Sequence, residues 1–201
     1  MSFGLSGPSG TGKTTLATAI SEQMGIELYL TNTTAILAEH GINPVGINSV
    51  EGRLTLQELL LENHFAVTQK LPRPFISDRT PLDYIAYMLA EVAMHGTDAA
   101  LGARIDAYVD RALFVADNTY QSIFICSALP VYEHDPKRPP FNLAYQRHFQ
   151  MIVEGALGRT QIENRIQLRT TDHAERLRFT FEHIIEAAKE ISAARSAATL
   201  H

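Results

Sequence analysis

A glycine-rich segment near the start of the chain, residues 3–16, constrains the fold more than any other feature. It reads Phe-Gly-Leu-Ser-Gly-Pro-Ser-Gly-Thr-Gly-Lys-Thr-Thr-Leu. The fixed positions of the pattern G-x-x-x-x-G-K-[ST] are filled by Gly7, Gly12, Lys13 and Thr14. The apolar run ahead of the pattern fits a short buried strand. The run behind it, to Met24, fits a helix, so the segment predicts a strand, a tight loop and a helix in succession.

Such a loop is suited to binding a polyphosphate. Glycines allow main-chain N–H groups to approach the phosphates closely, and the helix amino terminus that follows favours anions. Lys13 adds a positive charge for the β- and γ-phosphates, and the Thr14 hydroxyl is placed to ligate Mg²⁺. We therefore predict that the loop binds ATP with Mg²⁺. The predicted cofactor contacts are Gly7, Pro8, Ser9, Gly10, Thr11, Gly12, Lys13, Thr14 and Thr15.

Length and composition limit the remaining choices. The 201 residues suit one α/β domain over residues 1–201, and the hydrophobic content of 45% is ample for its core. The formal charge is −5 and no Lys/Arg-rich block occurs, so a broad electrostatic grip on duplex nucleic acid is not indicated. The single cysteine, Cys126, excludes an internal disulfide and suits a buried core position. We find no membrane-spanning stretch and no signal peptide, so we expect a cytoplasmic protein without membrane partners.

Short apolar runs alternate with helical patterns along the whole chain, which predicts parallel strands joined by crossover helices. The predicted strands are 3–5, 26–30, 75–77, 122–126 and 166–168. The predicted helices are 13–24, 34–40, 52–69, 81–94, 99–116, 142–157 and 173–194.

The second candidate site follows the third predicted strand. Asp78 and Arg79 come directly after Phe75–Ser77, where ligands bind in an open parallel sheet. Asp78 could hold Mg²⁺ or act as a base, and Arg79 could clamp an acceptor molecule. The alternative is that Asp78 caps the next helix. Asp83 fits a first-turn residue favoured by the helix dipole, with substrate contact as the other alternative.

The third candidate is a proline-rich loop after the fourth predicted strand. We interpret residues 130–147 as a lid in which Lys137 or Arg138 neutralises charge on the transferred phosphoryl group. Arg147 is a further candidate, and a solvated loop is the alternative.

Two further segments allow more than one interpretation. The polar segment Thr31–Thr34 could bond a base or sugar, or cap a short helix. No carboxylate lies between Glu27 and Glu39, so this segment supplies no base catalyst. Tyr84 and Tyr87 either line an acceptor pocket or pack in the core.

These motifs resemble the P-loop nucleoside and nucleotide kinases over roughly residues 1–185. The pattern is closest to the thymidylate-kinase family and to small AAA-type ATPase/kinases related to nicotinamide riboside kinase. The resemblance implies a P-loop NTPase fold, a three-layer αβα sandwich with a five-stranded parallel sheet in the order 2-3-1-4-5. It assigns the catalytic groups to Lys13, Asp78, Arg79 and Arg138, with Thr14 and Asp78 at the metal. Asp135 and Arg138 match the lid motif.

The resemblance also implies a function, an ATP-dependent transfer of the γ-phosphoryl group to a nucleoside- or nucleotide-type acceptor. Thr80 and the absence of an arginine-rich lid depart from thymidylate kinases proper. The chain also resembles phage kinases of 5-hydroxymethyluracil in DNA, so nucleic acid stays open as a substrate. That alternative requires a basic cleft built from Arg53, Lys70, Arg73, Lys137, Arg138 and Arg147. An NTP-driven switch acting on a protein partner is the alternative from another class, and a homodimer stays open.

Overall fold

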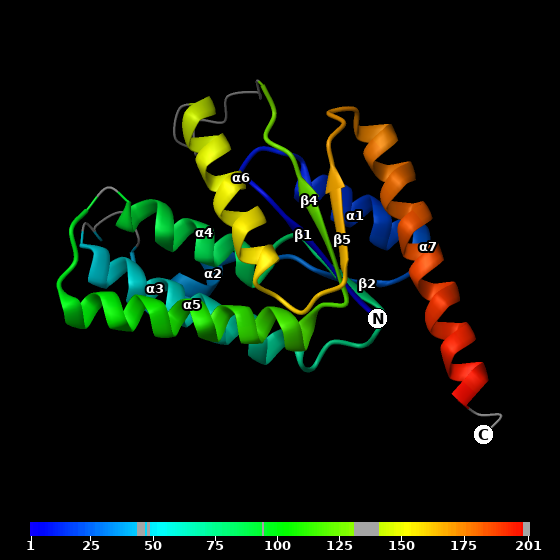
Figure 1. Ribbon diagram of the computed structural model, residues 1–201, viewed down its shortest axis with the longest axis horizontal. Coiled ribbons are helices and arrows are strands. Elements are labelled where there is room, and N and C mark those ends of the chain that lie inside the picture. Colours follow the sequence, from blue (N-terminus) through cyan, green and yellow to red (C-terminus); the bar gives the residue numbers. More distant parts are fainter. Residues whose placement is uncertain (44–46, 48, 94, 131–140, 199–201) are drawn as a thin grey trace.

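A five-stranded sheet forms the centre of the molecule (Figure 1). The computed structural model describes residues 1–43, 47, 49–93, 95–130 and 141–198. All pairings are parallel, and the strand order is β2-β3-β1-β4-β5. The strands are β1 (Ser2–Ser6), β2 (Glu27–Tyr29), β3 (Phe75–Ser77), β4 (Ser122–Cys126) and β5 (Asn164–Leu168). The predicted sheet order and strand direction are confirmed.

Helices cover both faces of the sheet. They are α1 (Lys13–Met24), α2 (Thr33–Glu39), α3 (Val50–Thr68), α4 (Pro81–Val92), α5 (Ala99–Thr119), α6 (Leu143–Gly158) and α7 (His173–Ala198). α1 and α7 pack on one face, whereas α3, α4, α5 and α6 pack on the other, and α2 packs against α3 (Figure 1). Among the described residues, no helix combines the length and the apolar character that a membrane span requires.

The strands divide their side chains between two apolar clusters. In β4, Ile123 and Ile125 face the larger cluster under α3–α6, while Phe124 and Cys126 face the smaller one under α1 and α7. This alternation with a period of two, apolar on both sides, is what a doubly covered parallel strand requires. The Cys126 thiol is fully buried, as predicted, and burial raises its pKa to about 11.

β5, α5 and α7 extend beyond their predicted bounds, whereas β2 and α4 are shorter than predicted. β5 begins at Asn164 instead of residue 166, because Asn164 and Arg165 pair with β4 although both are exposed. β5 is an edge strand, and its outer positions carry no apolar signal. α5 continues to Thr119 and α7 to Ala198, three and four residues beyond the predicted ends.

The topology brings the candidate segments to one edge of the sheet. β1 leads into the glycine-rich loop, and its neighbour β3 ends at Ser77, directly before Asp78. The other neighbour of β1 is β4, which ends at Cys126, directly before Ser127. Since the strands are parallel, these three ends lie at the same edge, where ligands bind in open α/β sheets.

Candidate phosphate-binding and acceptor site

The glycine-rich loop contains three glycines with positive φ, of which Gly7 and Gly12 are the most informative. Gly7 has φ 137°, and a Cβ there would lie 2.3 Å from the Cys126 carbonyl oxygen, so the position excludes a side chain. Gly12 has φ 79° in the left-handed region and directly precedes α1. Among the described residues, no side chain forms a capping hydrogen bond with α1. The N–H groups of its first turn are therefore left for an anion.

The side chain of Lys13 lies across the loop. Its Nζ donates to the carbonyl oxygens of Gly7, at 2.5 Å, and of Pro8, at 2.9 Å. The Thr11 hydroxyl donates to the same Pro8 oxygen at 2.9 Å. The ammonium is thus held at the mouth of the loop, where it can reach a phosphate.

Thr14 and Asp78 meet at the carboxyl end of β3. The Thr14 hydroxyl donates to Asp78 Oδ2 at 2.7 Å, and the Thr31 amide donates to Oδ1 at 3.0 Å. The side chains of Thr14 and Asp78 offer two hard oxygen ligands. Mg²⁺ in nucleotide sites is held by one or two protein groups together with phosphates and water, so this pair fits it. In the described ranges, no group of three or more His, Cys, Asp or Glu side chains forms a metal site.

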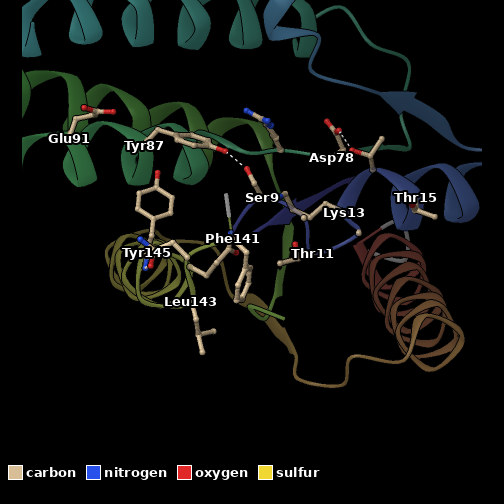
Figure 2. Close-up of a pocket in the computed structure, with 16 residues that line it drawn as sticks. Ser9, Thr11, Lys13, Thr15, Asp78, Tyr87, Glu91, Phe141, Leu143 and Tyr145 are labelled. Atoms are coloured by element: carbon tan, nitrogen blue, oxygen red, sulfur yellow. Dashed lines mark hydrogen bonds between the residues drawn. The ribbon is translucent and has the colours of Figure 1, made fainter. Parts of the chain in front are cut away.

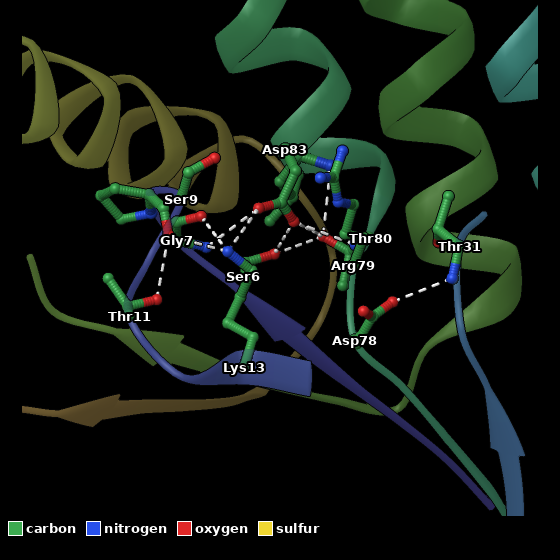
Figure 3. A network of polar contacts seen from close by, with 12 residues as sticks. Ser6, Gly7, Ser9, Thr11, Lys13, Thr31, Asp78, Arg79, Thr80 and Asp83 are labelled. Carbon is green, nitrogen blue, oxygen red and sulfur yellow. Dashed lines mark hydrogen bonds and ion pairs between the residues drawn. The ribbon is translucent and has the colours of Figure 1, made fainter. Parts of the chain in front are cut away.

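Asp83 fixes the loop to the start of α4. Its carboxylate is 1% exposed and accepts hydrogen bonds from the Gly7 amide at 3.0 Å, the Ser6 hydroxyl at 2.9 Å and the Thr80 amide at 3.0 Å (Figure 3). Lys13 Nζ lies 3.9 Å from Oδ1. The predicted first-turn position is correct, and Thr80 and Asp83 form a capping box. The contact with the phosphate-binding loop was not predicted.

The structure also places Asn32, Tyr84 and Tyr87, each of which had two possible roles in the sequence. Asn32 caps α2 by accepting from the Ala35 amide at 3.0 Å, so the capping alternative holds there. Tyr87 lies at the loop, sharing a hydrogen bond of 2.7 Å with the Ser9 hydroxyl. Tyr84 is 1% exposed and packs in the core.

Arg79 lies beside the loop, its guanidinium carbon 5.5 Å from the centre of the Tyr87 ring. Burial lowers the pKa of Arg79, but the tyrosines and aspartates around it more than offset this effect. The pKa therefore lies above its usual value and the group stays charged.

One cavity joins these groups (Figure 2). Its volume is about 1160 Å³, and it extends from the phosphate-binding loop past Arg79 to a groove between α4 and α6. It is lined by Ser9, Gly10, Thr11, Gly12, Lys13, Thr14, Thr15, Asp78, Arg79, Tyr87, Glu91, Phe141, Asn142, Leu143, Tyr145 and Gln146.

Several predicted cations are not placed at the cavity. Lys137 and Arg138, with Asp135, lie outside the described residues. Arg147 is exposed on α6 and is not among the lining residues. Arg73 donates to the Ser2 hydroxyl at the amino end of β1, opposite the phosphate-binding loop. Arg73 therefore does not contribute to a basic cleft at this site.

The AAA domain family (AAA_28) matches residues 3–176. The chain belongs to this family. Among curated proteins, no sequence shows a significant match.

Solved structures of deoxyadenosine kinase from M. mycoides share the fold of this AAA domain. The structure with the products dCMP and a flexible dCDP is 13% identical, with a TM-score of 0.63 over 93% of this chain and 100% of that one. The structure with dATP is 15% identical, with a TM-score of 0.58 over 92% and 99%. The structure with dCTP is 15% identical, with a TM-score of 0.54 over 94% and 100%.

The AAA domain also contains a buried hydrogen-bond chain that the sequence did not predict. It links Tyr84 to His64 Nδ1 at 3.1 Å, His64 Nε2 to Tyr120 at 2.8 Å, Tyr120 to Ser77 at 2.7 Å and Ser77 to the Arg79 carbonyl oxygen at 2.7 Å. The chain ends on a carbonyl, which can only accept. The Tyr120 hydroxyl lies 3.2 Å from the same carbonyl oxygen. The assignment that places a proton in each of the four links has each residue donate toward Arg79, with His64 protonated on Nε2.

Burial holds His64 in this neutral form by lowering its pKa to about 3. The chain fixes the backbone of the Asp78-Arg79 turn from α3. His64 lies in an otherwise apolar helical pattern, and no spacing signal connects it with Tyr120.

Arg176 of α7 was also missed. It is 4% exposed, and its guanidinium donates to the carbonyl oxygens of Thr11 at 2.6 Å, Thr170 at 2.5 Å and Ser127 at 3.3 Å. Arg176 thereby joins the phosphate-binding loop to the ends of β4 and β5. Its position early in the last helix, 165 residues from Thr11, gave no sequence signal.

Proposed function

We propose that the protein is an ATP- and Mg²⁺-dependent phosphotransferase that moves the γ-phosphoryl group of ATP to a nucleoside- or nucleotide-type acceptor. The observation that carries this proposal is the single cavity that joins the phosphate-binding loop to Asp78, Arg79 and the α4–α6 groove. A triphosphate tail occupies only the loop end of such a cavity, which leaves room for a second molecule.

The donor end is built from the loop and the start of α1. The amides of the loop and Lys13 bind the β- and γ-phosphates, and Thr14 with Asp78 holds Mg²⁺. The metal supplies charge neutralisation of the phosphates when it is bound. Asp83 keeps the loop in register with α4 through its bond from the Gly7 amide.

The acceptor end is built around Arg79. Its charged guanidinium orients the acceptor, and Asp78 lies close enough to the loop to assist the attacking hydroxyl. We assign Arg138 to the lid that covers the γ-phosphoryl group, on sequence alone. Phosphoryl transfer needs positioning and electrostatic stabilisation more than covalent chemistry, and this set of groups offers both.

The comparisons support a nucleoside-type acceptor. The solved structures of similar fold are of a deoxyadenosine kinase, and they span almost the whole of both chains. The sequence resemblance to thymidylate-type kinases points to the same reaction class.

In the test, the purified protein is incubated with ATP, Mg²⁺ and one acceptor, and ADP formation is measured. The acceptors are nucleosides, nucleoside monophosphates and DNA that contains 5-hydroxymethyluracil. We expect Lys13→Ala to lower turnover about 10²-fold or more, because it removes a charge aimed at the transferred group. Arg79→Ala is expected to remove acceptor-dependent turnover while ATP binding persists. Lys189→Ala and Arg178→Ala, both at exposed positions of α7, serve as matched controls.

Three outcomes separate the alternatives. ADP formation that depends only on the modified DNA would favour a DNA kinase. ATP hydrolysis that ignores every acceptor would favour a switch acting on a protein. Transfer by Arg79→Ala at the parental rate would refute the acceptor assignment.

A further inference from the structure

The cavity continues beyond the phosphate-binding loop into what we call the α4–α6 groove. It is lined by Tyr87 and Glu91 from α4, by Tyr145 and Gln146 from α6, and by Phe141, which precedes α6. Figure 2 shows Tyr87, Glu91, Phe141 and Tyr145 around it. The groove therefore combines aromatic rings with a carboxylate and an amide. That composition suits a planar ring with polar edges.

Gln146 is the most informative residue of the groove. The residue is 4% exposed, and within the described ranges its amide atoms are not among the fully buried side-chain atoms that lack a partner, so the amide opens onto the cavity. An amide that opens onto a cavity can exchange the water bonded to it for a polar group of a bound molecule. Gln146 lines the cavity, so a molecule bound there can pair with its amide.

Glu91 adds a second polar group from the opposite wall. It is half-buried and forms no ion pair with the described part of the chain. The pKa of Tyr145 is raised to about 12, mainly by burial and further by the neighbouring Tyr87 and Glu91. Glu91 from α4 and Tyr145 from α6 line the same cavity.

The aromatic walls are held in place from behind. The Tyr87 ring packs edge-on against Phe149 at 4.7 Å, and Tyr145 packs against the same ring at 6.3 Å. The Tyr87 hydroxyl is fixed by Ser9 at 2.7 Å. These rings offer stacking surface at little cost in conformational freedom, as sites for nucleobases require.

We propose that the α4–α6 groove binds the base of the acceptor and selects bases that carry an exocyclic amino group, such as adenine and cytosine. The hydrogen-bonding groups of the groove explain this preference. The Glu91 carboxylate and Gln146 Oε1 are two acceptors, and Gln146 Nε2 is a donor. An amino group supplies two N–H donors, and the adjacent ring nitrogen accepts from the amide.

Thymine and uracil match these hydrogen-bonding groups poorly. Their pairing edge has one N–H between two carbonyl oxygens, so one acceptor of the groove would face a carbonyl. Such a mismatch of buried polar groups is a strong basis for discrimination. The inference rests on the proposed phosphotransferase function, because it assigns the groove to the acceptor of that reaction.

The experiment measures kcat/KM for deoxyadenosine, deoxycytidine, thymidine and deoxyuridine, together with nucleoside binding by calorimetry in the absence of ATP. We expect the amino-bearing nucleosides to be preferred about tenfold or more. Glu91→Gln and Gln146→Leu are expected to reduce that ratio to about twofold or less, since each removes one of the matched groups. The matched controls Glu22→Gln and Gln23→Leu, at exposed positions of α1, should keep the parental ratio.

The outcomes of the two measurements differ for the two proposals. Equal or better use of thymidine, or a parental ratio in both groove variants, would overturn the base assignment and leave the phosphotransferase function standing. Selective binding without transfer would support the base assignment and refute the function. ATP binding with no binding of any nucleoside would overturn the base assignment.

Discussion

Two buried tyrosines of the same core allow a matched test of the hydrogen-bond chain. Tyr108 and Tyr120 are each 3% exposed, but only Tyr120 is paired, whereas the Tyr108 hydroxyl has no partner among the described residues. Tyr120→Phe would leave the buried Nε2–H of His64 without an acceptor. An unpaired buried donor costs about 1–3 kcal/mol, so we expect the free energy of unfolding to fall by about 2 kcal/mol.

Tyr108→Phe makes the same chemical change without breaking a bond. It removes a hydroxyl that is already unpaired, and we expect the free energy of unfolding to stay within about 0.5 kcal/mol of the parent or to rise. Urea unfolding followed by circular dichroism, extrapolated linearly to water with equal slopes, measures both changes. Equal losses in the two variants would refute the directed chain through His64.

Two further changes test the metal ligand and the buried histidine. Asp78→Asn keeps an oxygen for the Thr31 amide but removes the negative charge. We therefore expect the Mg²⁺ concentration for half-maximal turnover to rise about 10-fold or more. An unchanged Mg²⁺ dependence would contradict the assignment of Asp78 as a metal ligand. The pKa of His64 is about 3 in the folded protein against 6.5 for a free histidine, so the unfolded chain binds a proton first as the pH falls. The contribution of neutral His64 to the free energy of unfolding is complete above pH 6.5 and is lost towards pH 3, at up to about 1.4 kcal/mol per pH unit. We expect His64→Gln to flatten this pH dependence. Urea unfolding measured at several pH values between pH 6 and pH 4 tests the expectation.

The sheet was predictable because its signals are local or topological. β4 is apolar at every central position, as a strand covered on both faces must be, and the glycine pattern fixed the first strand, loop and helix. The ends of β5 and α7 were missed because polar residues continue an element through backbone pairing alone. Periodicity of apolar side chains cannot report such continuation.

The site was predictable only as far as neighbouring strand ends determine it. Asp78 and Thr14 are 64 residues apart, yet β1 and β3 are adjacent, so their meeting follows from the strand order. The contacts of Asp83, His64 and Arg176 depend on the packing of helices around the sheet. No spacing in the sequence encodes those contacts, and only the three-dimensional arrangement reveals them.

Arg176 has a consequence for how ligands affect stability. Its guanidinium is buried under the phosphate-binding loop with three carbonyl oxygens, and no carboxylate pairs with it in the described ranges. A buried charge without a counter-ion is costly to the folded state. An anion seated on the loop offsets that cost, so pyrophosphate alone should raise the melting temperature, even where Lys13 has been replaced.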